Sequence, residues 1–318
     1  MAGVMCLFAT GCTLIPDRQY APQHHNPFPQ LKRIAIVPFF NQSENPYVNG
    51  QRVAESYYQQ LQQIPGFEVI PIGVTMQRLR AFEAQRGQPS SGADWQAFAA
   101  FLGAEAVVVG SVTDFDSYYP PRMGMAVRWY AADSDLHPVP PGYGLPWGTP
   151  GEKHISPRVR KEAEFHLARA QIKSQRGAIP ASGAGGTGIV DAVTPMVLMD
   201  PAQEMAIGSG LPANWPTPTD LIPDGPSVGS RPQIPQSSPV FSHTALYRGD
   251  DSYVTKRLAD YVSAGDDARS IGWQGYLSRS NDYIRFCCHL HIAEMLESRG
   301  GRDQSDLILQ WPFGRYPQ

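Results

Sequence analysis

The stretch Leu31-Lys32-Arg33-Ile34-Ala35-Ile36-Val37-Pro38-Phe39-Phe40 decides the fold of this 318-residue chain. It is short, rich in β-branched residues and closed by a proline, which is typical of a buried β-strand. A second stretch, Ala106-Val107-Val108-Val109-Gly110-Ser111-Val112, is apolar throughout. Strands that are apolar on both faces are buried on both faces, so we expect this one at the centre of a sheet.

The residues between these strands predict helices and one more strand. A helix over 50–64 has a single apolar face, with Asn49 as its cap and Pro65-Gly66 as its end. A short strand follows over 67–72. Thr75 and Asp94 are the candidate caps of two further helices, and residues 123–130 read as the hairpin partner of the central strand.

The predicted order is therefore β-α-β-α-α-β-β over 31–132, the first part of an α/β (α+β) domain. Alternating strands and helices favour a small mixed sheet flanked by helices. Residues 133–239 are dominated by Pro and Gly clusters and bury too little apolar surface to offset the entropy of ordering. We expect a long disordered insertion there, within which 156–176 could form a helix.

Residues 240–318 are predicted to complete the domain with a strand and a helical C-terminal segment. The strand is expected over 239–247, and helices over the residues after Asp251 or Ser252, over 268–277 and over 281–298. A single domain is favoured over two independent ones because each half alone offers a thin core.

Three stretches carry a resemblance to a known group: Leu31–Asn41, Phe67–Pro71 and Leu102–Val112. Together they resemble the periplasmic α/β fold of the curli secretion lipoprotein CsgG, the penicillin-binding-protein activator LpoB and the N-terminal domain of TolB. The resemblance extends over 31–130 and 240–265. It implies a fold and a periplasmic lipoprotein, as a separate branch of that group, but no catalytic residues.

The N-terminus indicates a lipid anchor. A hydrophobic stub over 4–11 ends in Gly11-Cys12, and a polar, proline-rich stretch follows. A small residue before a cysteine resembles the end of a bacterial lipoprotein signal peptide, in which the cysteine becomes the lipidated N-terminus. We therefore predict a signal-like segment over 1–12, Cys12 as the lipidation site and a linker over 13–30. No basic residue precedes Cys12, so either the true start lies upstream or the stub is only a frayed terminus.

Composition limits the partners and the compartment. The net charge of −3 provides no basic field for nucleic acid. No stretch reaches the ~20 apolar residues of a transmembrane helix, so membrane attachment is expected through the lipid, in the periplasm and on the inner or outer membrane of a bacterium. Four cysteines, two of them adjacent in sequence, do not form a disulfide scaffold.

The most suggestive chemical cluster is Cys287, Cys288, His289 and His291. Thiolate and imidazole are good ligands for zinc or copper, and Cys287 and His291 lie one helical turn apart. A closed metal site needs about four ligands, and no partner motif is visible elsewhere. Core packing is the favoured interpretation. A metal site, a redox pair or vicinal disulfide, and a Cys–His nucleophile remain alternatives, and no cofactor is expected.

Five other motifs are better explained as structure than as sites. Asp114 and Asp116 read as solvated strand-end acids, residues 183–188 as a glycine-rich linker, and Arg248-Gly249-Asp250 as a turn before a helix. His24-His25 alone is too little for a metal site. The basic residues of 158–176 alternate with Glu162 and Glu164, which favours a solvated helix.

The leading hypothesis is a non-enzymatic lipoprotein that acts through contacts with envelope proteins. One alternative is an oligomeric secretion component like CsgG, which needs membrane-inserting hairpins; residues 112–130 are the one weak candidate. The other is a metal-dependent enzyme that uses the Cys287–His291 cluster. No catalytic motif in the sequence rises above background.

Overall fold

A computed structural model describes residues 17–21, 23–177, 237–264, 272–302 and 306–310. The chain divides into two compact units, one within 1–139 and 230–318 and the other within 140–229. The first unit contains β1 (Asp17–Ala21), β2 (Arg33–Ile36), β3 (Phe40–Asn41), α1 (Gly50–Gln62), β4 (Glu68–Ile70), α2 (Ile72–Arg86), α3 (Gly92–Leu102), β5 (Ala106–Asp116), β6 (Arg122–Ala131), β7 (Phe241–Arg248), α5 (Ser252–Ala264), α6 (Gln274–Ser278), α7 (Ser280–Glu297) and β8 (Asp306–Gln310).

The first unit is built on a six-stranded sheet in the order β4-β2-β5-β6-β7, with β3 also pairing with β5. β4, β2, β3 and β5 run parallel, and β5, β6 and β7 run antiparallel. The mixed sheet predicted from the sequence is confirmed, and β5 is central as expected. Residues 112–130 belong to the β5–β6 hairpin, whose strands also pair with β2, β3 and β7.

The strand predicted over 31–40 is interrupted. β2 ends at Ile36 and β3 begins at Phe40, and both pair with β5. The break falls at Pro38, which has no N–H to donate to the neighbouring strand. The Phe39 ring packs against Gly110 of β5, where an added Cβ would lie 2.4 Å from a ring carbon. A side chain at position 110 would therefore displace Phe39.

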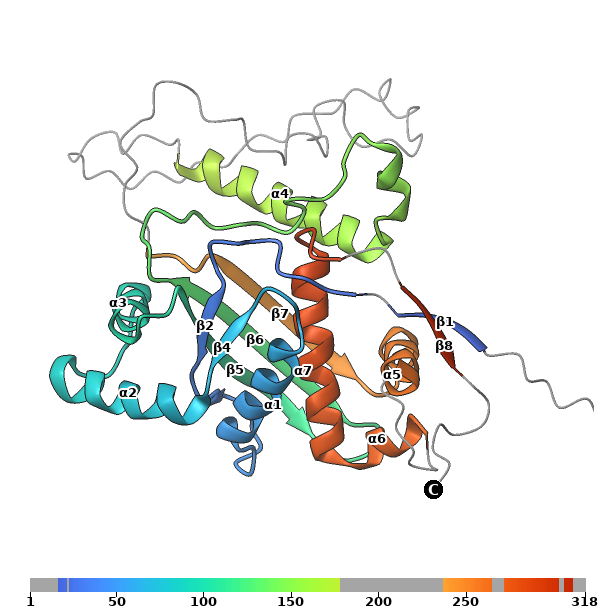
Figure 1. The fold of residues 1–318 in the computed structure, drawn as a ribbon, viewed down its shortest axis with the longest axis horizontal. Helices are drawn as coiled ribbons and strands as arrows, with labels where there is room; N and C mark the ends of the chain where they lie inside the picture. Colours follow the sequence, from blue (N-terminus) through green and yellow to red (C-terminus); the bar gives the residue numbers. More distant parts are fainter. Residues whose placement is uncertain (1–16, 22, 178–236, 265–271, 303–305, 311–318) are drawn as a thin grey trace, which may run out of the picture. The chain divides into compact units, whose positions relative to one another are not determined.

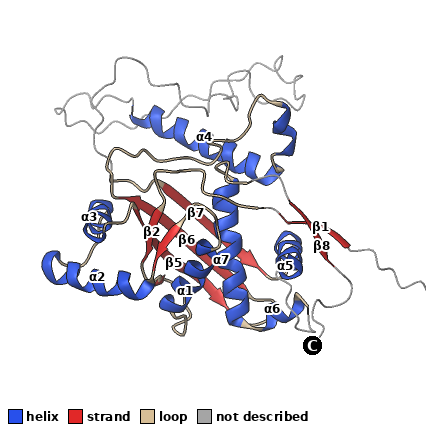
Figure 2. Cartoon of the chain, in the orientation of Figure 1, coloured by secondary structure: helices blue, strands red, loops and turns tan. Residues whose placement is uncertain are grey.

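Helices cover both faces of the sheet (Figures 1 and 2). α1 and α7 cross one face, over a core that includes Ile34, Val108 and Trp129. α2 and α3 pack on the other face, over Ala35, Val107 and Tyr130. This arrangement confirms the predicted sheet flanked by helices. Among the described residues, no helix combines the length and apolarity that crossing a membrane requires.

The N-terminal caps of the helices agree with the sequence-based predictions for one helix and differ from them for two others. Asn49 caps α1 as predicted, with its side chain accepting from the N–H groups of Gln51 and Arg52. The prediction for Asp94 is wrong by three residues, because Ser91 is the cap and Asp94 completes a capping box with it. The prediction for Thr75 is also wrong: Thr75 is buried inside α2, which begins at Ile72.

The C-terminal segment is helical as predicted. α6 is shorter than the helix expected over 268–277; Gly272 takes a positive φ of 61° in a turn before it, and 268–271 lie outside the described residues. α7 is buried around most of its circumference, by α1, α5 and α6 as well as the sheet. β8 pairs antiparallel with β1, which lies within the stretch predicted as a linker.

The second unit is described over 140–177. It contains a 3-10 helix η1 (Pro150–His154) and α4 (Pro157–Gly177), where the sequence allows a helix over 156–176. Trp147 and Ala163 form a small buried core, and the Trp147 indole N–H donates to the Gly142 carbonyl at 2.8 Å. Residues 178–236, the remainder of the predicted insertion apart from 237–239, lie outside the described residues.

Candidate functional site

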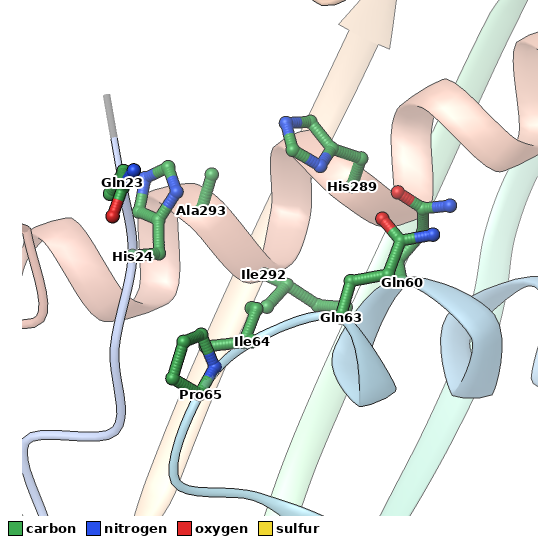
Figure 3. Close-up of a pocket in the computed structure, with 9 residues that line it drawn as sticks. All are labelled: Gln23, His24, Gln60, Gln63, Ile64, Pro65, His289, Ile292 and Ala293. Atoms are coloured by element: carbon green, nitrogen blue, oxygen red, sulfur yellow. The ribbon is translucent and has the colours of Figure 1, made fainter. Parts of the chain in front are cut away.

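A pocket of about 360 Å³ lies in the first unit, beside the C-terminal end of α1 (Figure 3). The segment before β2 supplies one side, α1 and the residues after it supply another, and α7 supplies a third. The lining residues are Gln23, His24, Gln60, Gln63, Ile64, Pro65, His289, Ile292 and Ala293.

The pocket has an apolar middle between polar sides. In Figure 3, Gln60 and Gln63 lie across the pocket from Gln23 and His24, with Ile64 and Ile292 between them. Gln60 is 4% exposed, and its carbonyl Oε1 has no hydrogen-bond partner in the described part of the protein. A buried acceptor without a partner costs about 1–3 kcal/mol, so this atom would gain from a bound donor.

His289 is uncharged in this environment. Burial, reinforced by nearby His24 and Arg257, lowers the pKa of His289 to about 3. An imidazole with so low a pKa is a poor base at neutral pH. Side-chain amides and a neutral imidazole both donate and accept hydrogen bonds. The pocket is therefore suited to binding an uncharged polar group rather than to transferring protons.

An ion-pair group adjoins the pocket, and we call it the Glu297 cluster: His24, Arg257, Glu297 and Arg302. The Glu297 carboxylate lies 3.0 Å from His24 Nε2, 2.9 Å from Arg257 Nη2 and 4.0 Å from Arg302 Nη1. Burial by itself raises the pKa of Glu297, but the hydrogen bond from His24 and the nearby arginines outweigh it and lower the pKa to about 2. Glu297 is thus an anion that holds the segment before β2.

Backbone contacts fix the same segment. The His25 N–H donates to the Gly301 carbonyl at 3.0 Å, and the Asn26 N–H donates to the Pro65 carbonyl at 3.0 Å. His24 also forms an isolated antiparallel bridge with Arg302. His24 and His25 therefore bind at the C-terminal end of α7, and Asn26 binds the residues after α1. Sequence reasoning missed this contact because His24 and Glu297 are 273 positions apart.

The predicted Cys–His cluster does not converge on one point. Cys287 and Cys288 are free and fully buried, and Cys288 Sγ lies 3.8 Å from the Val53 carbonyl. His289 lines the pocket, whereas His291 Nε2 donates to the His243 carbonyl at 3.3 Å. No group of three or more His, Cys, Asp or Glu side chains in the described part of the chain could hold a metal ion.

α7 and β7 share a second buried polar group that the sequence did not predict. The Tyr247 hydroxyl donates to Glu294 at 2.8 Å, and His243 Nε2 lies 3.4 Å from the same carboxylate oxygen. The His243 and His291 rings are in contact, with centroids 4.7 Å apart. The sequence feature that could have indicated this group is the polar pair His291 and Glu294, which lie three residues apart on an otherwise apolar helix face. The group ties α7 to β7.

The other motifs have structural roles where they are described. Asp114 pairs with Arg122 at 3.2 Å, and Arg248 pairs with Asp250 at 2.7 Å in the turn before α5. His24 contributes to the pocket and the Glu297 cluster. Cys12 and residues 183–188 lie outside the described residues.

The buried thiols give a direct prediction. Burial raises the pKa of both Cys287 and Cys288, and the neighbouring Cys288 raises the pKa of Cys287 further. The thiolate is the reactive form, so we expect maleimide labelling in the folded protein to be at least about 100-fold slower than in urea. In a Cys6→Ser/Cys12→Ser variant, Cys287 and Cys288 are the remaining thiols, so the mass increase on labelling reports on this pair alone. Rapid labelling of the folded chain would contradict the buried placement.

No protein-family model and no curated protein matches the chain. Solved structures to which the chain is similar include lipoprotein GNA1162 from Neisseria meningitidis, at 17% identity over 31% of this chain and 69% of that chain, with a TM-score of 0.25. They also include the PelC dodecamer from Paraburkholderia phytofirmans, at 13% identity over 36% and 67% of the two chains, with a TM-score of 0.21.

The C-terminal domain of LpoB from Escherichia coli is also similar, at 14% identity over 31% of this chain and 71% of that chain, with a TM-score of 0.24. The resemblance of the sequence to LpoB, to CsgG and to the N-terminal domain of TolB stays a prediction.

Proposed function

We propose that this chain is a lipid-anchored, non-enzymatic adaptor of a bacterial cell envelope, acting in the periplasm through contacts with other envelope proteins. The observation that carries the proposal is the Gly11-Cys12 boundary after an apolar stub. In this proposal Cys12 carries the lipid, and the polar residues after it lead from the membrane to the domain.

The geometry at His24 supports a mechanical role for that stretch. A flexible linker transmits no orientation to the domain that it tethers. Here the segment joins the domain through β1–β8 pairing, the His25–Gly301 hydrogen bond and the Glu297 cluster. An anchor at Cys12 would therefore hold the C-terminal end of α7 toward the membrane.

The chemistry of the candidate residues supports binding rather than catalysis. Cys287 and Cys288 are buried thiols with raised pKa values, which makes them packing groups rather than nucleophiles. His289 has too low a pKa to serve as a base at neutral pH. The pocket offers uncharged donors and acceptors, which fits recognition.

The test is lipid labelling in a bacterial host, with the full upstream reading frame and Cys12→Ser as the variant. We expect the wild type to incorporate a palmitate analogue and to fractionate with membranes, and the variant to lose the label completely. Cys6→Ser is the matched control and should keep the label. A wild type that is unlabelled and released with the soluble fraction would overturn the proposal.

A further inference from the structure

Two adjacent tyrosines are exposed in the turn between β5 and β6. Tyr118 is 83% exposed and Tyr119 is 76% exposed. The Asp116 carboxylate accepts from the Tyr118 N–H at 2.9 Å, which fixes the start of the turn. Tyrosine rings are enriched in protein interfaces because they bury a large area at little cost in conformational entropy.

A second turn packs against the first. The Gly249 N–H donates to the Pro121 carbonyl at 2.7 Å. A Cβ added at Gly249 would lie 2.8 Å from Pro121 and 3.2 Å from Leu277 of α6, so the two turns and α6 are in close contact. Residues 116–121 and 249–251 therefore form one continuous surface, which we call the tyrosine surface.

The tyrosine surface carries an excess of negative charge. Asp250 is neutralised by Arg248, since the two side chains form hydrogen bonds at 2.7 and 3.1 Å. Asp116 accepts the Tyr118 N–H, whereas Asp251 accepts the Tyr253 N–H and also lies close enough to Arg248 to raise the pKa of that guanidinium. Arg248 thus faces two carboxylates, so one negative charge of that turn and the charge of Asp116 remain. Asp116 and Asp251 are exposed or half-exposed carboxylates beside the exposed rings.

The tyrosine surface lies toward the start of α7, away from His24 and His25, which bind at the end of that helix. α6 precedes the start of α7, whereas His24 and His25 bind beyond its end, at Glu297 and Gly301. Figure 1 shows α6 and the C-terminal end of α7 at opposite ends of the sheet. An α-helix rises about 1.5 Å per residue, so the length of α7 separates the two by roughly 27 Å.

We propose that the tyrosine surface is the docking site for a basic, extended segment of a partner protein. Lysine and arginine side chains are attracted to the faces of tyrosine rings, and Asp116 and Asp251 supply the opposite charge. Acidic segments are repelled by the same carboxylates. The inference rests on the proposed adaptor function, because an adaptor needs a surface to which a partner protein binds.

The test is fluorescence polarisation with labelled octalysine and octaglutamate peptides at low salt. The protein is the full-length chain with Cys12→Ser, so the result does not depend on lipidation and a failure here leaves the labelling experiment untouched. We expect octalysine to bind and octaglutamate not to bind. Tyr118→Ala/Tyr119→Ala should weaken octalysine binding about tenfold.

Charge variants separate specific docking from general attraction to an acidic chain. Asp116→Asn/Asp251→Asn removes two charges but keeps both backbone hydrogen bonds, and should weaken binding about three- to tenfold. Asp133→Asn/Asp260→Asn removes two exposed charges elsewhere and should change binding less than about twofold. Equal losses in the two charge variants, or no loss in the tyrosine variant, would overturn the proposal.

Discussion

Replacing Arg299 with alanine lowers the free energy of unfolding by about 2–4 kcal/mol. Arg299 is the second residue after α7 and is 2% exposed. Its guanidinium donates to the Val139 carbonyl at 3.0 Å, to the Met295 carbonyl at 2.9 Å and to the Ser242 carbonyl at 3.3 Å. Alanine leaves these buried acceptors without a donor, and each such loss costs about 1–3 kcal/mol, partly offset by removal of a buried charge.

The packing of Arg299 adds to this loss. Its guanidinium lies 5.4 Å from the centroid of the Phe241 ring, and it also donates to the Ser298 hydroxyl at 3.0 Å. It thereby joins the end of α7, the start of β7 and the loop at Val139. Lysine keeps the charge but presents one ammonium instead of a planar fork, so Arg299→Lys should recover only part of the stability.

Urea denaturation followed by tryptophan fluorescence measures these differences. Arg285→Ala is the matched control, because Arg285 lies on the same helix and is exposed. Its free energy of unfolding should stay within about 0.5 kcal/mol of the wild type. Equal midpoints for Arg299→Ala and Arg285→Ala would show that Arg299 does not join the three elements.

The elements with strong local patterns could be predicted from the sequence. β5 is apolar throughout and is central, and α1 has one apolar face and a side-chain cap at Asn49. Ser91 was missed because Asp94 is an equally good capping residue and takes part in the same capping box. Local patterns thus identify an element more reliably than they locate its first residue.

The candidate site could not be predicted, because its residues come from distant parts of the chain. Gln60 and His289 are ordinary polar residues on their own helices, and only the packing of α1 on α7 brings them to one pocket. Arg299 lies just after a helix, where a basic residue usually interacts with exposed carbonyls and solvent. Its burial depends on contacts with Val139 and with Ser242 of β7, and these two residues are more than a hundred positions apart in the sequence.

Acidification from pH 6.5 destabilises the protein through the half-buried His289 and the buried His291. Burial lowers the pKa of His289 to about 3 and places the pKa of His291 well below its ordinary range. The unfolded chain takes up these protons near pH 6.5 and the folded chain does not, so stability falls as the pH falls. For His289 alone, the loss between pH 6.5 and 4.5 is about 2 kcal/mol.

Glu297 extends the loss of folding stability to lower pH. Its pKa of about 2 lies below the ordinary value of 4.5, so the stability it contributes is present above about pH 4.5 and is lost as the pH falls toward 2. The two effects occupy different pH ranges, and urea midpoints measured from pH 7 to pH 3 separate them. His289→Gln should reduce the slope of stability against pH between pH 6.5 and 4.5 by the amount that corresponds to about one proton.

His137→Gln, which replaces an exposed histidine, is the matched control for the dependence of stability on pH. If His289→Gln has the same profile as the wild type, His289 takes up its proton in the folded protein. The pocket would then carry a cation facing His24 and the Glu297 cluster, and it would attract an anionic group instead of an uncharged one. The slope of the unfolding free energy against pH between pH 6.5 and 4.5 therefore decides whether the pocket can bind an uncharged or an anionic group. This result does not depend on what the chain is anchored to.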